Sequence, residues 1–149
     1  MNSTQNPFST QIRVRYAETD KMGIAYNGHY LTWFEVGRCE MLRNFGLNYM
    51  GLEHSGYHFP LNEAGIKYLK PALYDDVLTI VCSLSRKPGV RIRIEYDVRK
   101  EGETIATGFT EHAFTDGKLK PVRPPKEIRE KMLKAWKLSR EMSNRSLQL

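Results

Sequence analysis

The sequence predicts an α+β fold in which a five-stranded antiparallel sheet wraps around one long central helix, with a further helix at the C-terminal end. Three observations predict it. Residues 29–45 carry apolar residues at helical spacing, a strand-like segment at 11–16 precedes them, and four strand-like segments at hairpin spacing fill residues 59–115. A helix as apolar as 29–45 should be buried on most sides, and a curled sheet achieves this.

A short strand and a polar loop come before the helix. Alternate residues of the 11–16 segment are apolar, the period-two pattern of a strand with one solvent-facing side. Residues 17–28 contain two Gly together with Asp, Glu, Thr and Asn, which indicates a structured loop. The helix is expected over 29–45, with Gly46 just past its end as a stop signal, and residues 49–56 favour a short extra turn. The apolar helix positions are Tyr30, Leu31, Phe34, Met41, Leu42 and Phe45.

Strands dominate the second half of the chain. They are expected at about 59–68, 77–86, 90–100 and 104–115. In the third strand every second residue from Val90 to Val98 is apolar and those between are charged. Residues 100–103 predict a hairpin turn between the last two strands. Pro124 and Pro125 then open an amphipathic helix, because proline is tolerated in a first helical turn.

Length and composition fit one continuous domain over residues 1–149, with a core at about 11–125 and a C-terminal helix at about 125–142. Hydrophobic residues make up 40% and charged residues 27%, which excludes a disordered chain and a membrane protein. No stretch approaches the ~18 apolar residues of a membrane span, and residues 1–11 are polar where a signal peptide is apolar. We therefore expect a cytoplasmic protein.

Charge and cysteine content narrow the possible partners. The net charge of +6 favours anionic partners such as phosphates, whether on a nucleic acid or on a cofactor. No recognised nucleic-acid motif is present, so we expect no nucleic acid. Cys39 and Cys82 lack metal-ligand and redox spacing, and we expect both to be buried thiols, with no metal site.

The most informative stretch is residues 14–30, VRYAETDKMGIAYNGHY. Together with YLTWFEVGR at 30–38 and KPALYDD at 70–76, it resembles the 4-hydroxybenzoyl-CoA thioesterase family, in particular the YbgC-type acyl-CoA thioesterases. The resemblance covers residues 11–125. It implies the hotdog fold, which is the sheet-around-helix arrangement expected above, and an enzyme that hydrolyses acyl-CoA thioesters.

The resemblance implies that Asp20 is the catalytic carboxylate, acting as nucleophile on the thioester carbonyl or as general base on water. The chemistry is reasonable, because a thioester is already activated and needs one positioned carboxylate plus stabilisation of the developing oxyanion. Unpaired N–H groups at the helix start could supply that stabilisation, and Asn27 and Gly28 lie where they begin. The alternative is that Asp20 only caps a turn.

Other loop residues match family positions less completely. Tyr16 and Tyr26 match positions near the acyl pocket, although each could be a plain core tyrosine. Many YbgC-type members have a histidine seven residues after the aspartate, where this chain has Asn27. His29 could compensate, or be an ordinary surface or core histidine. Glu35 matches a helix glutamate of the family, or forms a surface ion pair with Arg38.

Coenzyme A is part of the substrate, so no separate cofactor is expected. Its phosphates could bind basic residues near the strand ends, and the alternative is that these residues are solvated surface charges. The candidates are Arg86, Lys87 and Arg91 around the Pro88–Gly89 turn, and Lys118 after the last strand.

Two further function classes compete with a thioesterase. One is a non-catalytic hotdog module that binds acyl groups or an anionic partner, and the other is a hotdog dehydratase, for which no Asp/His pair can be placed. We expect a homodimer joined by the sheet edges, and a dimer of dimers could form a tetramer. The alternative is a monomer whose open edge is shielded by the C-terminal helix around Trp136.

Overall fold

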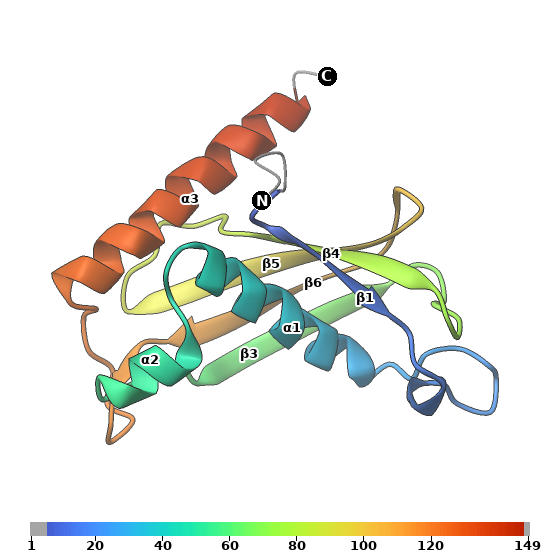
Figure 1. Ribbon diagram of the computed structural model, residues 1–149, viewed down its shortest axis with the longest axis horizontal. Coiled ribbons are helices and arrows are strands. Elements are labelled where there is room, and N and C mark those ends of the chain that lie inside the picture. Colours follow the sequence, from blue (N-terminus) through green and yellow to red (C-terminus); the bar gives the residue numbers. More distant parts are fainter. Residues whose placement is uncertain (1–5, 148–149) are drawn as a thin grey trace.

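A five-stranded antiparallel sheet and a long helix on its inner face form the centre of the molecule (Figure 1). The computed structural model describes the backbone of residues 6–147 and the side chains of residues 6–144. The sheet strands are β1 Ser9–Arg13, β3 Leu61–Tyr68, β4 Val77–Ser83, β5 Arg91–Lys100 and β6 Glu103–Ala113. The helices are α1 His29–Asn44, α2 Tyr49–His54 and α3 Lys126–Leu147, with a 3-10 turn η1 at Tyr16–Glu18. Two short strands, β2 Tyr57–His58 and β7 Thr115–Asp116, pair with each other.

The expected number of strands in the sheet is confirmed, but the expected run of four hairpin-linked strands is wrong in one place. The order is β1-β4-β5-β6-β3, so β4, β5 and β6 form a meander while β3 pairs with β6 rather than with β4. Residues 69–76 are too long for a tight hairpin and cross the molecule instead. The strands before and after α1 therefore lie at opposite edges of the sheet.

The core lies between α1 and the inner face of the sheet. The alternation expected in β5 is confirmed, since Ile92, Ile94, Tyr96 and Val98 are all buried. The Phe34 ring of α1 stacks on Tyr96 with ring centroids 4.1 Å apart. Gly108 of β6 permits this approach, because a Cβ there would come within 2.6 Å of the Phe34 ring.

The sequence predicted that helix α1 would be buried on most sides, and this prediction is wrong. Its sheet-facing residues are buried, but Leu31 and Val36 are 41% and 38% exposed. The sheet covers one face of the helix only, and within residues 6–144 no other element covers the opposite face. The exposed side of α1 therefore carries Leu31 and Val36 together with the polar residues Thr32 and Glu35.

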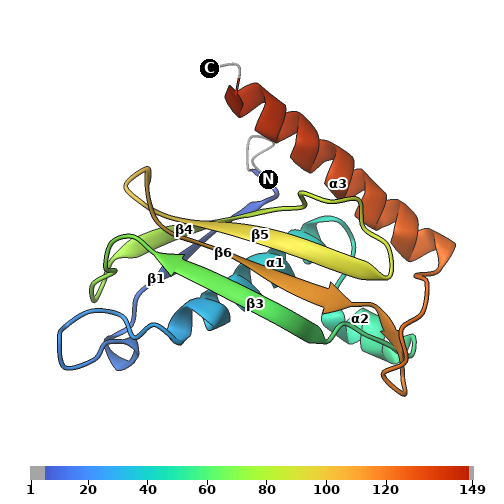
Figure 2. The same ribbon diagram turned by 180° about the vertical axis from the view of Figure 1, so that it is seen from behind.

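Helix α3 lies on the β1/β4 side of the molecule, away from the edge strand β3 (Figure 2). Its Ser139 hydroxyl accepts the Leu84 N–H, and Lys131 donates to the Gly46 carbonyl. The helix therefore leaves the β3 edge uncovered, while its C-terminal half lies beside residues Phe8 and Ser9 at the β1 edge. The helix also runs about one turn beyond the expected end at residue 142.

Local boundaries agree with the sequence in most other places. Helix α1 ends at Asn44 with Gly46 at φ 78°, and α2 occupies the expected extra turn. The β5–β6 hairpin turns through Glu101 and Gly102, both at positive φ. Of the two thiols, Cys82 is buried and Cys39 is only partly buried.

Candidate active site

The loop before α1 is built around a buried carboxylate, Glu18. It is 4% exposed, and its two oxygens accept the Arg15 N–H at 2.8 Å and the Trp33 indole N–H at 2.9 Å. Burial alone would raise the pKa of Glu18, but these hydrogen bonds and the Arg15 side chain lower it overall. The Glu18 carbonyl also accepts the Tyr26 N–H. Glu18 thus ties both ends of the loop to the first turns of α1.

A distant segment holds the same loop from the other side. The Ala25 N–H donates to the Ala72 carbonyl, and Val14 exchanges backbone hydrogen bonds with Asp75 and Asp76. Ile24 forms an isolated bridge with Leu73. Residues 70–76, which carry part of the family resemblance, therefore act as a scaffold for the loop.

Asp20 lies in a tight turn at the tip of this loop, beside the Thr19–Ala25 bridge. Its Oδ1 accepts the Met22 N–H at 2.9 Å, and its backbone N–H donates to the Ile24 carbonyl. Asp20 therefore does hold a turn, which is the alternative to catalysis that the sequence left open. Oδ2 has no hydrogen-bond partner among the described residues, and the side chain is partly exposed. One carboxylate oxygen holds the turn while the other stays available.

The start of α1 offers two unpaired donors. Gly28 caps the helix without a side-chain hydrogen bond, and no acceptor among residues 6–144 takes the N–H of Asn27 or of Gly28. The helix dipole makes this end positive. The Asn27 carbonyl, in contrast, is held by Tyr68, whose hydroxyl donates to it at 2.8 Å. The arrangement has the geometry of an anion-stabilising helix terminus.

Two aromatic side chains border these donors. The Tyr26 ring lies against Gly28, where a Cβ would come within 2.9 Å of it, and meets the His29 ring edge-on at 5.9 Å. Tyr26 is 54% exposed and is therefore no core tyrosine. Tyr16 is 77% exposed and packs edge-on against Tyr74 instead. The structure thus groups Tyr26, Asn27, Gly28 and His29, and places Tyr16 apart from them.

The basic residues suggested for phosphate binding lie at the other end of the sheet. Arg91 is opposite Ala113, next to the Leu61 end of β3, whereas Tyr68 at the far end of β3 reaches the loop. The length of β3 separates the two ends by roughly 23 Å at 3.3 Å per residue. Arg86, Lys87 and Lys118 are exposed and form no ion pair within the described side chains. The subunit itself does not bring these four residues to Asp20.

Arg38 differs from its expected place on the helix surface. It is 9% exposed, its Nε donates to the Tyr49 hydroxyl at 2.9 Å, and no ion pair joins it to Glu35 in the described part of the chain. The expected Glu35–Arg38 pair is therefore wrong, because Arg38 turns toward the sheet while Glu35 faces solvent. Both border a cavity of about 630 Å³ between α1, α2 and the beginning of β3.

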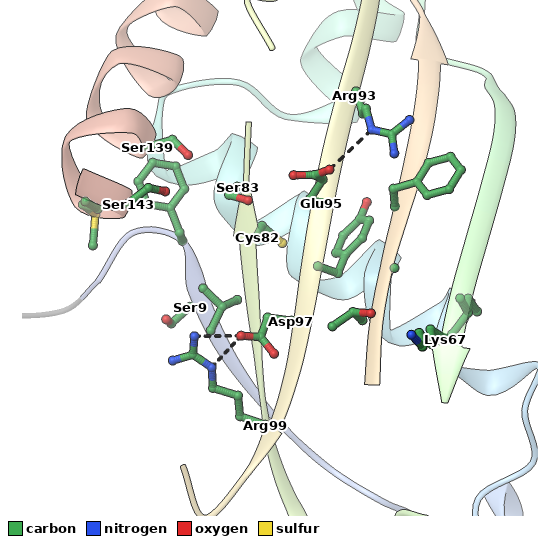
Figure 3. A pocket seen from close by; sticks show the side chains of 18 of the residues that line it. Ser9, Lys67, Cys82, Ser83, Arg93, Glu95, Asp97, Arg99, Ser139 and Ser143 are labelled. Atoms are coloured by element: carbon green, nitrogen blue, oxygen red, sulfur yellow. Dashed lines mark hydrogen bonds and ion pairs between the residues drawn. The ribbon is translucent and has the colours of Figure 1, made fainter. Parts of the chain in front are cut away.

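A cavity of about 940 Å³ lies on the outer face of the sheet beside the C-terminal half of α3 (Figure 3). Charged side chains of β5 line it, with Arg93 near Glu95 and Asp97 bound to Arg99. None of the loop residues discussed above borders this cavity. It is therefore separate from the candidate site. Within the described residues no cluster of three or more His, Cys, Asp or Glu could hold a metal ion.

Comparison with known proteins places the chain in a family. Residues 14–132 match the model of the thioesterase-like superfamily. The chain belongs to this superfamily. It is 32% identical over 126 residues to the acyl-CoA thioesterase YbgC of Haemophilus influenzae, covering 83% of this chain and 93% of that protein.

Solved structures agree with this assignment. A Thermus thermophilus protein, TT1821, superposes with a TM-score of 0.82 at 32% identity, covering 85% of this chain and 98% of that one. A DHNA-CoA thioesterase from Staphylococcus aureus superposes with a TM-score of 0.74 at 34% identity, covering 77% and 78% of the two chains. The fold is accordingly the hotdog fold. No helix within residues 6–147 combines the length and apolar character needed to cross a bilayer.

Three residues that shape the site were not singled out from the sequence. Glu18 and Trp33 form a buried pair, and Tyr68 reaches the loop from a different strand. The spacing of Arg15 and Glu18 is that of a helix-capping pair and could have indicated the role of Glu18. The Tyr68 contact joins residues 41 positions apart, so no local pattern reveals it.

Proposed function

We propose that this protein is an acyl-CoA thioester hydrolase that releases a free acid and coenzyme A. The observation that carries the proposal is that one loop holds both an Asp20 carboxylate oxygen and, where α1 starts, two N–H groups, none of which has a hydrogen-bond partner among the described residues. Membership of the thioesterase-like superfamily and similarity to proteins named as acyl-CoA thioesterases support the substrate class.

The reaction needs two contributions from the site. The N–H groups of Asn27 and Gly28 would donate to the thioester oxygen, which becomes negatively charged in the tetrahedral intermediate. Asp20 Oδ2 would take a proton from the attacking water, or would itself attack the carbonyl carbon and form an anhydride that water then opens. In either route the carbon–sulfur bond breaks and the coenzyme A thiolate leaves with a proton from the medium.

A single turnover in ¹⁸O-labelled water distinguishes the two routes. Attack by Asp20 leaves the first acid product without label from the water, because its new oxygen comes from the carboxylate when water opens the anhydride at the aspartyl carbon. Label would then be found in Asp20 by mass spectrometry of the peptide. A general-base route puts the label in the acid and leaves Asp20 unlabelled.

The active unit in this proposal is a homodimer joined through β3. This strand is an edge of the sheet with most of its residues exposed, and unpaired edge N–H and C=O groups can pair with a second copy. Antiparallel pairing would lay the Leu61 end of one β3 beside the Tyr68 end of the other. Basic residues such as Arg91 of the second copy would then approach the site.

Two measurements test this function. Release of free thiol from acetyl-CoA, octanoyl-CoA and benzoyl-CoA should reveal turnover of at least one substrate, while binding of all three without turnover would favour a non-catalytic acyl-binding module. Light scattering with activity over a dilution series tests the assembly and also distinguishes a dimer from a dimer of dimers. A fully active monomer would refute the shared site.

A further inference from the structure

The hydroxyl of Tyr68 contacts the backbone of the candidate site directly beside the unpaired N–H groups. It donates to the Asn27 carbonyl at 2.8 Å, and the same carbonyl accepts the Tyr30 N–H at the start of α1. Tyr68 is the last residue of β3, so this hydrogen bond links the edge strand to the loop. It is the only side-chain hydrogen bond that a residue of β3 makes within the described residues.

The Asn27 carbonyl and the Gly28 N–H belong to one planar peptide unit. Because a trans peptide is rigid, its C=O and N–H point in opposite directions, and anchoring one fixes the direction of the other. Tyr68 holds the carbonyl from the helix side. The Gly28 N–H is therefore aimed away from the helix, into the space where the thioester oxygen would bind.

From this geometry we infer that Tyr68 is a positioning residue that orients the Gly28 oxyanion donor through the Asn27–Gly28 peptide. The inference rests on the proposed function, since it assigns Tyr68 to the same site. The residue touches no reacting atom and acts only through the backbone. Its contribution should therefore be felt in the transition state, when charge develops on the oxygen, and little in substrate binding.

The surroundings of Tyr68 suit this role. Its ring packs edge-on against the Tyr30 ring at 4.9 Å, and Tyr30 is itself only 2% exposed. Burial and the neighbouring Tyr26 raise the pKa of Tyr68, so the phenol stays protonated and remains a donor at neutral pH. The ring is thus fixed by packing, and its hydroxyl makes the shorter of the two hydrogen bonds that orient the Asn27–Gly28 peptide, at 2.8 Å against 3.4 Å for the Tyr30 N–H.

The test compares Tyr68→Phe with Tyr74→Phe. The first change removes only the hydroxyl and keeps the ring on Tyr30, while Tyr74 is a similarly exposed tyrosine whose hydroxyl has no hydrogen bond among the described residues. With the fastest substrate of acetyl-CoA, octanoyl-CoA and benzoyl-CoA, Tyr68→Phe should lower kcat about 10-fold with KM within about 2-fold. That is less than the roughly 100-fold cost of losing an oxyanion donor outright. Tyr74→Phe should match the wild type.

A spectroscopic measurement separates positioning from a structural role. The same acyl-CoA, labelled with ¹³C at the thioester carbonyl, is bound to the Asp20→Asn variant and to Asp20→Asn with Tyr68→Phe. Hydrogen bonding lowers the carbonyl stretching frequency, so the band of the double variant should move back toward that of the free substrate. A purely structural role would lower the unfolding midpoint and leave this band in place.

Each outcome decides one of the two claims. A wild-type protein that hydrolyses none of the three acyl-CoAs overturns the proposed function and the role of Tyr68 together. An active protein in which Tyr68→Phe behaves as Tyr74→Phe does, or raises KM alone, or leaves the carbonyl band unmoved, overturns the role of Tyr68 and leaves the proposed function intact.

Discussion

Two polar regions lie on the same helix, one at the first turn of α1 and one in its third turn, and they differ in how their hydrogen bonds are used. The first turn leaves the N–H groups of Asn27 and Gly28 unpaired beside the exposed rings of Tyr26 and Tyr68. In the third turn the Arg38 side chain lies beside a buried chain of hydrogen bonds through the core, which joins Tyr96, Thr110, His112 and Phe59.

The donor and the acceptor of each hydrogen bond in the buried chain can be assigned, starting from the Phe59 carbonyl. The Phe59 carbonyl can only accept, so His112 Nδ1 donates to it and Nε2 accepts from the Thr110 hydroxyl at 2.9 Å. Thr110 in turn accepts from the Tyr96 hydroxyl at 2.6 Å. Each hydroxyl and each ring nitrogen of this chain therefore has a partner.

The two regions differ in whether they have hydrogen-bonding groups that are still free to bind a ligand. Buried polar groups that are all paired stabilise one arrangement of the core and have nothing left for a ligand. Donors without a protein partner at a solvent-facing helix terminus are paired only by water and remain free to bind an anion. We therefore expect changes in the first-turn region to alter catalysis, and changes in the buried chain to alter folding.

The largest effect should come from Asp20→Asn. Losing the carboxylate should lower kcat by roughly 10² to 10⁴. Stability should hardly change, because the asparagine oxygen can still accept the Met22 N–H and keep the turn. Steady-state kinetics and urea unfolding measure the two quantities on one preparation. Retention of more than about a tenth of wild-type turnover would contradict the catalytic assignment and would leave Asp20 as a turn residue only.

The second prediction concerns acid stability and the buried chain. Burial and the nearby Arg38 charge lower the pKa of His112 from an ordinary 6.5 to about 4. A protonated ring could also no longer accept from Thr110. Between these values the unfolded chain binds a proton that the folded chain does not. The stability that His112 contributes is therefore complete above pH 6.5 and is lost as the pH falls to about 4, a change of about 3 kcal/mol.

Urea unfolding of the wild type and of His112→Gln between pH 7 and pH 4.5 measures this change. The wild type should lose more stability than the variant, whose side chain does not titrate. If the variant does not fold, the imidazole resonances of the wild type report the same quantity by NMR. Uptake of a proton by His112 near pH 6.5 in the folded protein would contradict this prediction, because the buried hydrogen-bond chain would then tolerate a charged imidazole.

The smallest effect is expected for Gly28→Val. Its Cβ would stand 2.9 Å from the Tyr26 ring, which is exposed and can move, so unfolding stability should change by less than about 1 kcal/mol. The branched side chain would stand beside the unpaired N–H groups, and kcat/KM should fall about tenfold. Gly28→Ala is the matched control and should fall less. Equal kinetics for the wild type and Gly28→Val would place the thioester carbonyl elsewhere.

Local patterns in the sequence predicted the elements well where burial alternates strictly. The extent of strand β5 and the limits of α1 could be predicted from the sequence, because apolar residues mark the buried face of each element and charged residues mark the exposed face. The order of the strands could not be obtained in this way, because an edge strand such as β3 has a similar local pattern whichever neighbour it pairs with.

The site was predictable only in part. Asp20 and the start of α1 were located through the family resemblance, whereas the local pattern alone favoured a turn aspartate, and that turn is present. Arg38 was misplaced because its spacing from Glu35 suits a surface pair, while Tyr49, whose hydroxyl accepts from it, comes from a later segment. Contacts between distant segments are absent from any local pattern.

The hydrogen bonds from residues 72–76 to the loop have a consequence for the order of folding. The backbone partners of Ala25 and Val14 come 47 and 62 residues later in the chain, at Ala72 and Asp76. Closing so long a loop costs entropy that must be offset by sheet pairing, so the loop should order only after β1 has joined β4. On the ribosome, the N-terminal half of the chain would carry an unformed site until β4, which ends at Ser83, had emerged. Slowing synthesis before that point should therefore delay the appearance of activity without changing the final fold.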